Sequence, residues 1–564
     1  MFGKRTLVLV ALACCLSLGA GVASVAAPGV AAASPAESAD TVFSGRFLTL
    51  DAGRPLAASV ATRGGRVLAV GDARDVAAHV TDATRRVSFE GVAVPGLADA
   101  HVHAGALGEQ LETLDLRGLQ KAAILARVAA RAAELPAEEW VQGRGWDQGF
   151  WSPPAFPTAS ELDQVAPSHP VLLTRIDGHS VWVNSAALAR ARIARDTRDP
   201  EGGRILRSED GSPSGMLVDN AVDLVQRALP SPTREQRRRR LEAALRRYVS
   251  WGLTSIHDAG VDLEQIDLYK ELLSRNELPL RAYLMANAPG STAEHYLAAR
   301  PEIDLGGRLT IRSFKVYLDG ALGSRGAQML DAYADAPGDR GLELTSDEAL
   351  RRLLKEAAAK GYQVNAHAIG DRAVRRALDG FEWLGPAARQ LRCRVEHVSL
   401  VTDADLPRFA ALGVVASMQP IFVGEYARWA SDRVGPERLR TVYRTADLLR
   451  AGAAIAAGSD YPASDSGEPV MTLYSMVTRM GVGASPAGGW QPAQRVTVDE
   501  ALRAMTSTPA FAAFQEHDLG TLAAGRFADF TVLSADPRST PPERLSELGV
   551  EMTVVGGEIV YRKP

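Results

Sequence analysis

Short apolar runs alternate with helical patterns through the middle of this 564-residue chain. Apolar runs of about four to eight residues are typical of buried strands, whereas apolar positions at i, i+3, i+4 and i+7 indicate helices. The runs predict eight strands, at residues 94–103, 253–258, 280–285, 310–318, 362–367, 394–398, 414–418 and 454–460. Eight strands in β/α alternation are the count of a TIM barrel, in which the active site lies at the carboxyl ends of the strands.

Local signals predict where some of the intervening helices begin and end. Thr345 with Glu348, and Thr497 with Glu500, have the spacing of capping boxes at helix starts. Gly361 fits the C-terminal cap of the helix that Thr345 would begin. These signals support helices between the predicted strands.

Both ends of the chain show another pattern, in which apolar and polar residues alternate between glycine-rich turns. This pattern predicts short antiparallel strands at 42–50, 58–62, 66–70, 530–533, 552–555 and 558–561. Because chain ends often lie close together, we expect one small β domain from residues 41–93 and 520–562. The barrel would then cover residues 94–519, with an insertion over about residues 114–249 after its first strand.

The first thirty or so residues differ from all that follow. Lys4 and Arg5 precede an apolar stretch that ends near Leu18, and small residues with A-x-A-like sites come next. This layout predicts a secretory signal peptide and the start of a linker over residues 1–33. An uncleaved N-terminal anchor is the alternative, although the apolar core is short for a membrane span. We expect an exported protein, periplasmic or extracellular, with no stable membrane span after cleavage.

Charge and cysteine content exclude some classes of protein. Lys and Arg total 63 and Asp and Glu total 67, so the chain has no excess positive charge for a nucleic-acid backbone. The basic run 237–240 lies among apolar residues at helical spacing, and we interpret it as a solvated helix face. Without the signal peptide, Cys393 is the only cysteine, which predicts a fold without an internal disulfide. The expected partner is a small-molecule substrate. The sequence leaves open whether the protein forms a homo-oligomer.

Several predicted strands end in residues that can bind metal. His101 and His103 close the first strand, and residues i and i+2 of an extended segment point the same way. His367, His397 and Asp460 each close another apolar run, where a core does not favour an ionisable group. Neutral imidazoles and a carboxylate suit Zn²⁺ and related divalent ions. Four hydrogen-bonded core histidines are the alternative, which requires four separate coincidences.

Lys315 lies within the fourth predicted barrel strand. A lysine there must either point outward between helices or reach the site, because a buried and unpaired ammonium is costly. The residues alone leave both orientations open.

Motifs in order along the chain resemble the amidohydrolase superfamily. They are VPGLADAHVHAG, NAHAIGDRAV, VEHVSL, AAGSDYP and GTLAAGRFADFTVL. GRGWDQGFW, DGHSVWVNSAAL, GLTSIHDAG and KVYLDGALGSRGA resemble its YtcJ-like branch, which includes N-substituted formamide deformylases. The resemblance runs from about Thr41 to the C-terminus. It implies a metal-dependent hydrolase on a distorted (β/α)8 TIM barrel, with a composite β-sandwich domain from both chain ends.

The resemblance also implies metal ligands on five of the barrel strands. They are His101, His103, Lys315, His367, His397 and Asp460. Lys315 falls where many members carry a carboxylated lysine that bridges two metals. We therefore expect a divalent metal, zinc, as one or two ions.

Further residues are candidates for substrate contact. They are His257 at the end of the second barrel strand, His179, Asn184, Trp146 and Asp147 in the insertion, and Arg325 beyond strand four. Each has a structural alternative. Buried polar groups can serve hydrogen bonding within the fold, tryptophans pack in cores as often as they line pockets, and an arginine can fix its own loop instead of binding a carboxylate.

The expected ligands imply a mechanism. A bound divalent ion lowers the pKa of water to about 7 and polarises a carbonyl group. Asp460 would take the proton from this water and pass it to the leaving amine. We expect a hydrolase that cleaves an amide-type C–N bond of a small molecule by metal-activated hydroxide, with Asp460 as general base and acid. The alternatives are a cyclic-amide hydrolase, deaminase or esterase on the same site, and a non-catalytic binding or regulatory protein.

Overall fold

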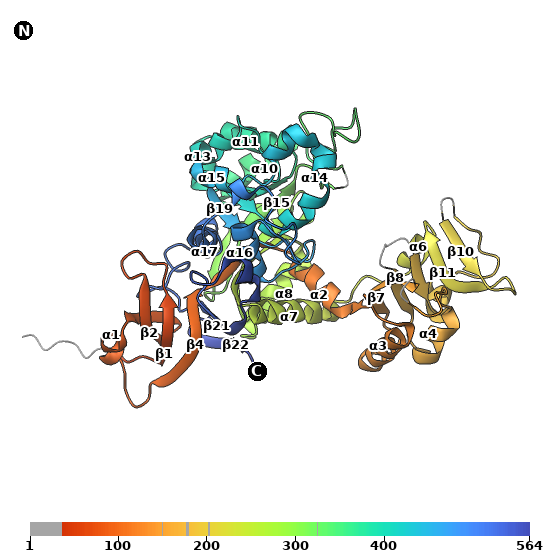
Figure 1. The fold of residues 1–564 in the computed structure, drawn as a ribbon, viewed down its shortest axis with the longest axis horizontal. Coiled ribbons are helices and arrows are strands. Elements are labelled where there is room, and N and C mark those ends of the chain that lie inside the picture. Colours follow the sequence, from red (N-terminus) through yellow and green to blue (C-terminus); the bar gives the residue numbers. More distant parts are fainter. Residues whose placement is uncertain (1–36, 149–150, 176–179, 201–202, 324) are drawn as a thin grey trace, which may run out of the picture. The chain divides into compact units, whose positions relative to one another are not determined.

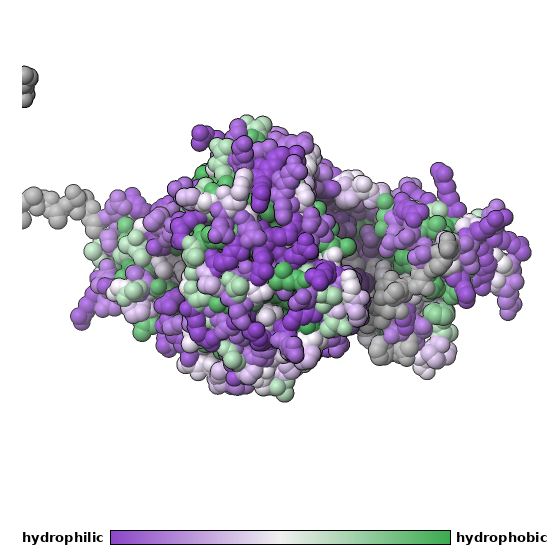
Figure 2. Space-filling model, turned by 90° about the horizontal axis from the view of Figure 1, so that it is seen from above, coloured by the Kyte–Doolittle hydropathy of each residue, from purple (hydrophilic) through white to green (hydrophobic). Residues whose placement is uncertain are grey.

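The structure is a computed structural model that describes residues 37–564, except 149–150, 176–179, 201–202 and 324. The predicted signal peptide therefore lies outside the described residues. None of the described helices is both long enough and apolar enough to span a membrane. The face seen in Figure 2 is mainly hydrophilic, with hydrophobic residues in scattered small areas.

The middle of the chain forms a nearly closed barrel of eight parallel strands (Figure 1). In sheet order they are β19 (Ala454–Ala457), β18 (Val415–Met418), β17 (Arg394–His397), β16 (Gln363–Ala368), β15 (Leu309–Tyr317), β13 (Arg281–Asn287), β12 (Leu253–Val261) and β5 (Leu97–Val102). The edge strands meet where the Asp460 N–H donates to the His101 carbonyl oxygen at 2.7 Å. The eight-stranded barrel predicted from the apolar runs is confirmed. A short strand, β14 (Glu302–Leu305), pairs antiparallel with β15.

Amphipathic helices follow the barrel strands and bury one face against them. They are α2 (Ala104–Glu112), α7 (Arg234–Ser250), α8 (Leu263–Ser274), α9 (Ser291–Leu297), α10 (Asp347–Lys360), α11 (Asp371–Leu384), α12 (Pro386–Gln390), α13 (Leu406–Leu412), α14 (Val423–Arg438), α15 (Thr445–Arg450), α16 (Pro469–Thr478), α17 (Val498–Ala504) and α18 (Ser507–Ala512). In α11, Val374, Leu378 and Phe381 are buried at helical spacing. These helices cover the barrel sheet. Most residues of its strands are therefore buried, as is usual for a parallel sheet.

The predicted helix caps are partly confirmed. Thr497 forms the capping box at the start of α17, and Gly361 ends α10 with a φ of 90°. The box predicted at Thr345 is wrong, because Ser346 is the N-cap of α10. The Thr345 hydroxyl instead donates to the Tyr317 carbonyl oxygen at 2.6 Å, which ties the helix start to the end of β15.

Both chain ends contribute to one seven-stranded sheet. Its order is β22 (Glu558–Arg562), β21 (Val550–Val555), β20 (Phe530–Leu533), β4 (Arg85–Pro95), β1 (Thr41–Leu48), β2 (Leu56–Arg63) and β3 (Arg66–Gly71), with α1 (Ala73–Ala77) after β3. The two ends join where β20 pairs antiparallel with β4. The rings of Phe43 and Phe530 pack edge to face at 4.9 Å in the shared core. Hydrogen bonds connect all seven strands in one path rather than in two separate sheets.

A second, six-stranded sheet is inserted between β5 and β12. Its order is β10 (Gly203–Arg207), β11 (Pro213–Asp219), β9 (Ser180–Val183), β8 (Val171–Arg175), β7 (Val141–Trp146) and β6 (Leu114–Asp115), and its helices are α3 (Lys121–Glu134), α4 (Ala159–Val165), α5 (Ser185–Arg190) and α6 (Val222–Gln226). Leu241, Leu245 and Tyr248 of the following helix, α7, belong to the core of the barrel. The inserted sheet therefore ends before α7.

The basic run on α7 faces acidic partners. Its four arginines form ion pairs at 2.7 to 3.3 Å with Asp262, Glu242, Glu139 and Glu112. These partners neutralise the run, in agreement with its interpretation as a polar helix face.

Candidate metal centre

Three predicted metal ligands meet at the carboxyl ends of the two edge strands. His101 lies in β5, His103 follows its last residue, and Asp460 lies three residues beyond β19. Asp460 Oδ1 is 3.0 Å from His103 Nε2 and 3.5 Å from His101 Nε2. One ligand atom from each residue falls within 4.8 Å of those of the other two. The i and i+2 positions on the first strand thus direct both imidazoles to one carboxylate.

Two more histidines extend this cluster from neighbouring strands. The His397 ring at the end of β17 lies 4.3 Å from the His367 ring on β16 and 4.9 Å from the His101 ring, measured between centroids. His397 Nδ1 is 3.9 Å from Asp460 Oδ2. His367 Nε2 is buried and has no hydrogen-bond partner. All four histidines predicted from strand ends therefore lie in one cluster.

Lys315 is buried inside the barrel, beside this cluster. Its Nζ lies 3.0 Å from His101 Nε2 and 5.0 Å from the centre of the Tyr317 ring. Burial lowers the pKa of the Lys315 ammonium. Of the two orientations that the sequence left open, the structure has the inward one.

A buried carboxylate and a backbone carbonyl orient the two histidines of the first strand. His101 Nδ1 donates to Glu396 Oε2 at 2.6 Å, and His103 Nδ1 donates to the Ala259 carbonyl oxygen at 3.0 Å. These hydrogen bonds assign the protons to Nδ1 and leave each Nε2 lone pair free to bind a metal. Glu396 was not predicted, although a charged residue two positions after Arg394 in an apolar strand indicates an inward-facing polar pair.

Asp319 also lies beside the cluster and was not predicted. Its oxygens accept three backbone N–H groups at 2.8 to 3.0 Å, from Gln328, Ile369 and Gly370, and lie 3.6 Å from His367 Nε2. Burial raises the pKa of this carboxyl to about 7. Its position two residues after the end of β15, the strand that carries Lys315, is the signal that could have indicated it.

The protonation states of the cluster fit a divalent cation. Burial lowers the pKa of His101, His367 and His397 well below the usual value, so these imidazoles are neutral at pH 7. Burial alone would raise the pKa of Asp460, but the contact with His103 and the nearby charges outweigh it, so the pKa is lowered. Neutral imidazoles and an ionised carboxylate are the ligand forms that a divalent ion requires. The buried His367 Nε2, which has no hydrogen-bond partner, is a further donor of this kind.

A cavity of about 310 Å³ opens onto these residues. His103, Lys315, His367, His397 and Asp460 form its polar part. The remainder is mainly apolar and aromatic, and is lined by Tyr317, Ala321, Leu322, Gly323, Ile369, Phe422, Glu425, Tyr426, Trp429, Tyr443 and Ala463. Sequence reasoning missed the residues from the start of α14. Aromatic residues directly after a strand of the barrel were the signal that could have indicated them, because those segments form the barrel mouth.

His257 lies apart from this cavity. It was expected at the end of a strand but occupies the middle of β12, which continues to Val261. Its Nδ1 lies 3.0 Å from Arg394 Nη1, and its ring packs 5.2 Å from that of Tyr283. Both contacts are within the barrel interior, so the structure does not bring His257 to the metal ligands.

Two candidates for substrate contact in the insertion form hydrogen bonds and packing contacts within the fold. Asn184 is the N-cap of α5, and its side chain bonds four backbone groups, the N–H of Val171 and Ala187 and the carbonyls of Ala166 and His169. Trp146 is fully buried, with its ring 5.6 Å from that of Trp151, and its Nε1 donates to Leu173. The structural alternative describes both positions.

The other candidates for substrate contact are engaged in ion pairs or lie outside the described residues. Asp147 pairs with Arg175 at 2.8 Å. Arg325 pairs with Asp335 at 3.0 Å, which fixes its loop, as the alternative for this residue stated. His179 lies outside the described residues.

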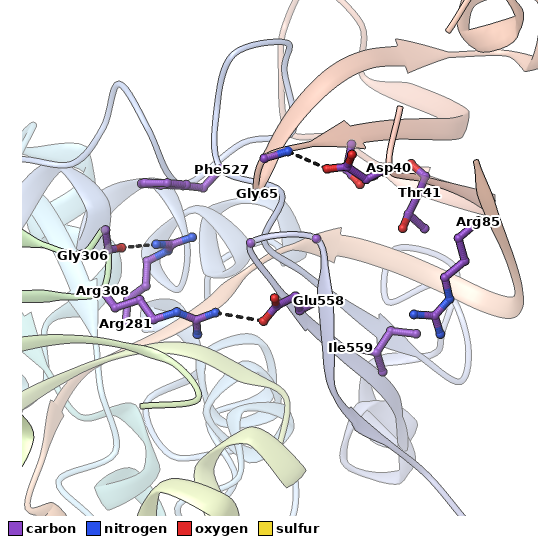
Figure 3. A pocket seen from close by; sticks show the side chains of 15 residues that line it. Asp40, Thr41, Gly65, Arg85, Arg281, Gly306, Arg308, Phe527, Glu558 and Ile559 are labelled. Carbon is purple, nitrogen blue, oxygen red and sulfur yellow. Dashed lines mark hydrogen bonds and ion pairs between the residues drawn. The ribbon is translucent and has the colours of Figure 1, made fainter. Parts of the chain in front are cut away.

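A second cavity of about 740 Å³ lies beside the amino-terminal end of β13, between barrel loops and the β domain (Figure 3). Its lining includes glycine-rich turns and charged side chains, among which Arg281 and Arg308 form ion pairs. Arg281 forms a buried, bidentate ion pair with Asp529 at 2.7 and 2.8 Å, and Arg308 lies 3.4 Å from Glu558. The Arg281 guanidinium also stacks over Phe527 at 3.6 Å. These contacts connect the barrel to the β domain.

Comparison with known proteins identifies the family. Residues 90–561 match the sequence model of the Amidohydrolase family. YtcJ of Bacillus subtilis (strain 168) is 33% identical over 492 residues, covering 85% of this chain and 91% of YtcJ. An N-substituted formamide deformylase of Arthrobacter pascens is 26% identical over 551 residues, covering 93% of this chain and 98% of the deformylase.

A solved structure agrees with this assignment. An uncharacterized metal-dependent hydrolase from Pyrococcus furiosus superimposes with a TM-score of 0.71 at 25% identity, covering 88% of this chain and 100% of the archaeal one. This chain therefore belongs to the amidohydrolase family and is a hydrolase of the class that acts on carbon–nitrogen bonds.

Proposed function

We propose that this protein is a zinc-dependent amidohydrolase that cleaves an amide-type C–N bond of a small molecule. The observation that carries the proposal is the convergence of neutral histidines and one carboxylate at a cavity on the barrel mouth. Barrel enzymes place their chemistry at this end of the strands.

The residues suited to hold the metal are the four histidines, Asp460 and Lys315 in carboxylated form. The Nε2 lone pairs of His101 and His103 point to the same carboxylate oxygen, Asp460 Oδ1. A divalent ion bound there would lower the pKa of a bound water and polarise the substrate carbonyl. Carboxylated Lys315 would let the site hold about two ions instead of one.

Asp460 is the group that moves the proton. Its Oδ1 faces the two histidines, and its Oδ2 faces the cavity side near His397. Asp460 Oδ2 accepts a proton from the attacking water and delivers it to the leaving nitrogen as the C–N bond breaks. The lowered pKa of Asp460 keeps this carboxylate ionised and ready to accept the proton at neutral pH.

The remaining residues position these groups. Glu396 fixes the tautomer and orientation of His101 through the 2.6 Å hydrogen bond. The aromatic part of the cavity excludes water from the substituent of the substrate, and so holds the scissile bond near Asp460.

The test is a substrate panel on protein loaded with Zn²⁺. Formamides, N-acyl amino acids, cyclic amides and esters of matched size are compared by release of amine, carboxylate or alcohol. Release of amine from a linear amide, with the largest kcat/KM of the panel, is the expected result. Turnover confined to cyclic amides, deamination or esters would replace the proposed substrate class, and no turnover at all by metal-loaded protein would contradict the proposed reaction.

We also propose that the protein is exported. The basic start, short apolar core and small-residue sites of the first 33 residues support cleavage between about residues 26 and 34. N-terminal sequencing of protein recovered from its host tests this, and an intact Met1 in the cytosolic fraction would contradict it.

A further inference from the structure

One face of α14 supplies both an aromatic wall and a carboxylate to the cavity. Phe422, Glu425, Tyr426 and Trp429 follow the i, i+3, i+4 and i+7 spacing of a single helix face, and all four line the cavity. The same cavity is lined by Asp460. A substrate whose scissile bond lies at Asp460 can therefore extend along this helix face.

The aromatic rings are held in fixed positions. Tyr426 lies 4.5 Å from Trp429 and 4.9 Å from Tyr443, between ring centroids. Tyr426 and Tyr443 are buried, and the Tyr426 hydroxyl is 3.4 Å from the Ser399 hydroxyl. Preorganised aromatic faces attract a cation placed within about 6 Å of the ring centre.

Glu425 is the acidic group of this wall and lacks a basic partner. In the described part of the chain, no lysine, arginine or histidine lies within the 4.0 Å that defines an ion pair with its carboxylate. Arg428 of the same helix is exposed, and its charge acts on Glu425 from beyond ion-pair distance. Burial, with a further contribution from the charge of Asp465, raises the pKa of Glu425. Its negative charge is therefore offset only in part, by the charge of Arg428 and by a hydrogen bond with Trp429.

The chemistry of the wall favours a charged substituent over a neutral one. An uncharged apolar group would fill the aromatic part but desolvate the Glu425 carboxylate further without supplying a countercharge, which is unfavourable. A protonated amine would satisfy Glu425 and meet the ring faces of Tyr426 and Trp429 at once.

We propose that Glu425, Tyr426 and Trp429 form a subsite for a protonated amine of the substrate, remote from the scissile bond. The inference rests on the proposed amide hydrolysis at the same cavity and specifies its substrate class, monoacylated diamines. One nitrogen of the diamine carries the acyl group and the other carries the positive charge. Water adds to the acyl carbon, the C–N bond breaks, and the freed nitrogen takes the proton, giving a carboxylic acid and the diamine.

The first test is a pair of amides that differ only in charge. N-formyl-1,5-diaminopentane is compared with N-formylhexylamine, in which a methyl group replaces the ammonium. We expect kcat/KM to favour the charged amide by at least about tenfold in the parent protein. Glu425→Gln should abolish this preference, chiefly through a fall in kcat/KM for the charged amide. Asp432→Asn, which removes an exposed charge from the same helix, is the matched control and should keep the preference.

The second test measures binding without turnover. Quenching of tryptophan fluorescence is followed while hexylammonium chloride or hexanol is added to metal-loaded protein, with Trp429→Phe to assign the signal. The ammonium ion should bind at least about tenfold more tightly than hexanol, and Glu425→Gln should remove the difference.

The outcomes separate the subsite from the reaction. A charge preference in binding without turnover of any amide would contradict the proposed reaction and leave the subsite standing. Turnover of neutral amides without a charge preference, or a preference that survives in Glu425→Gln, would overturn the subsite. If Glu425→Gln lowers only Tm, the residue supports the start of α14 and the subsite is likewise overturned.

Discussion

The two charged cavities of this protein lie at opposite ends of barrel strands and differ in how their charges are paired. Beside the start of β13, Arg281 and Asp529 satisfy each other in a buried ion pair. Arg308 faces Glu558 in the same region (Figure 3). At the carboxyl ends of the strands, His103 and Asp460 meet, and His367, whose Nε2 has no hydrogen-bond partner, lines the same cavity. The first cavity is the larger of the two.

This difference shows that volume and charge do not identify a functional site by themselves. Mutually paired charges stabilise a junction, and little binding capacity remains for a ligand. Convergent donors that stay unpaired are costly to bury, and a bound metal removes that cost. Substitutions at the metal cluster should therefore lower metal content and turnover, whereas a substitution at the Arg281 cavity should lower stability.

The largest effect is expected from removing a ligand at the metal cluster. In His103→Ala, metal content and turnover should fall together, by more than the roughly 10–100-fold that loss of an outer-shell partner costs. His257→Gln alters another barrel histidine and should retain its metal. Elemental analysis and turnover are measured on the same preparations, and full metal content in His103→Ala would remove this residue from the ligand set.

At the other cavity, a substitution should affect stability instead. Asp529→Asn leaves the Arg281 guanidinium buried without its charge partner and should lower the free energy of unfolding by about 3–5 kcal/mol. The control is Asp518→Asn, whose partner Arg66 also stacks on Phe527 but is about 40% exposed, so about 0–1 kcal/mol is expected. Urea unfolding gives both values, and turnover per folded molecule should stay at the parental level. A loss of turnover at parental stability would assign this cavity a functional role.

Glu396→Gln tests a residue that acts through His101. The amide can still accept the Nδ1 proton but lacks the negative charge, so metal affinity should fall by about 10–100-fold while the fold is retained. Competition with a chelator measures the affinity. An unchanged affinity would show that Glu396 does not position the metal ligand.

The smallest effect concerns the number of ions. The parent protein should hold about two divalent ions, and Lys315→Ala at most about one, because the bridging group is lost. Elemental analysis after expression with added Zn²⁺ gives the count. One ion in the parent protein would contradict only the bridge, since the histidine cluster could still hold that ion.

The sequence predicted the barrel well because its strands are buried on both faces and appear as continuous apolar runs. The histidines were found for a related reason, since an ionisable residue that closes such a run is conspicuous. The helix start at Thr345 was misassigned because Thr345 and Ser346 are both good N-cap residues. Only the hydrogen bond to Tyr317, which depends on the tertiary structure, decides between them.

The rest of the site depends on contacts that local patterns do not contain. Asp258 suggested a strand end, but its carboxylate is satisfied by Tyr269 and Gln265, so β12 continues to Val261 and His257 lies in mid-strand. The aromatic face of α14 has the spacing of an ordinary core helix. Its place on the cavity follows from the packing of the barrel mouth.

The most direct test of the account is the pair of measurements, metal content and turnover, on Asp460→Asn. An amide oxygen can still coordinate weakly and the histidines remain, so most of the metal should be retained. The rate should nevertheless fall by about 10²–10⁴-fold, because the amide cannot accept a proton from water or deliver it to the leaving nitrogen. If Asp460→Asn keeps its metal and its turnover stays within about threefold of the parental value, the central claim that Asp460 moves the proton at this metal centre is contradicted.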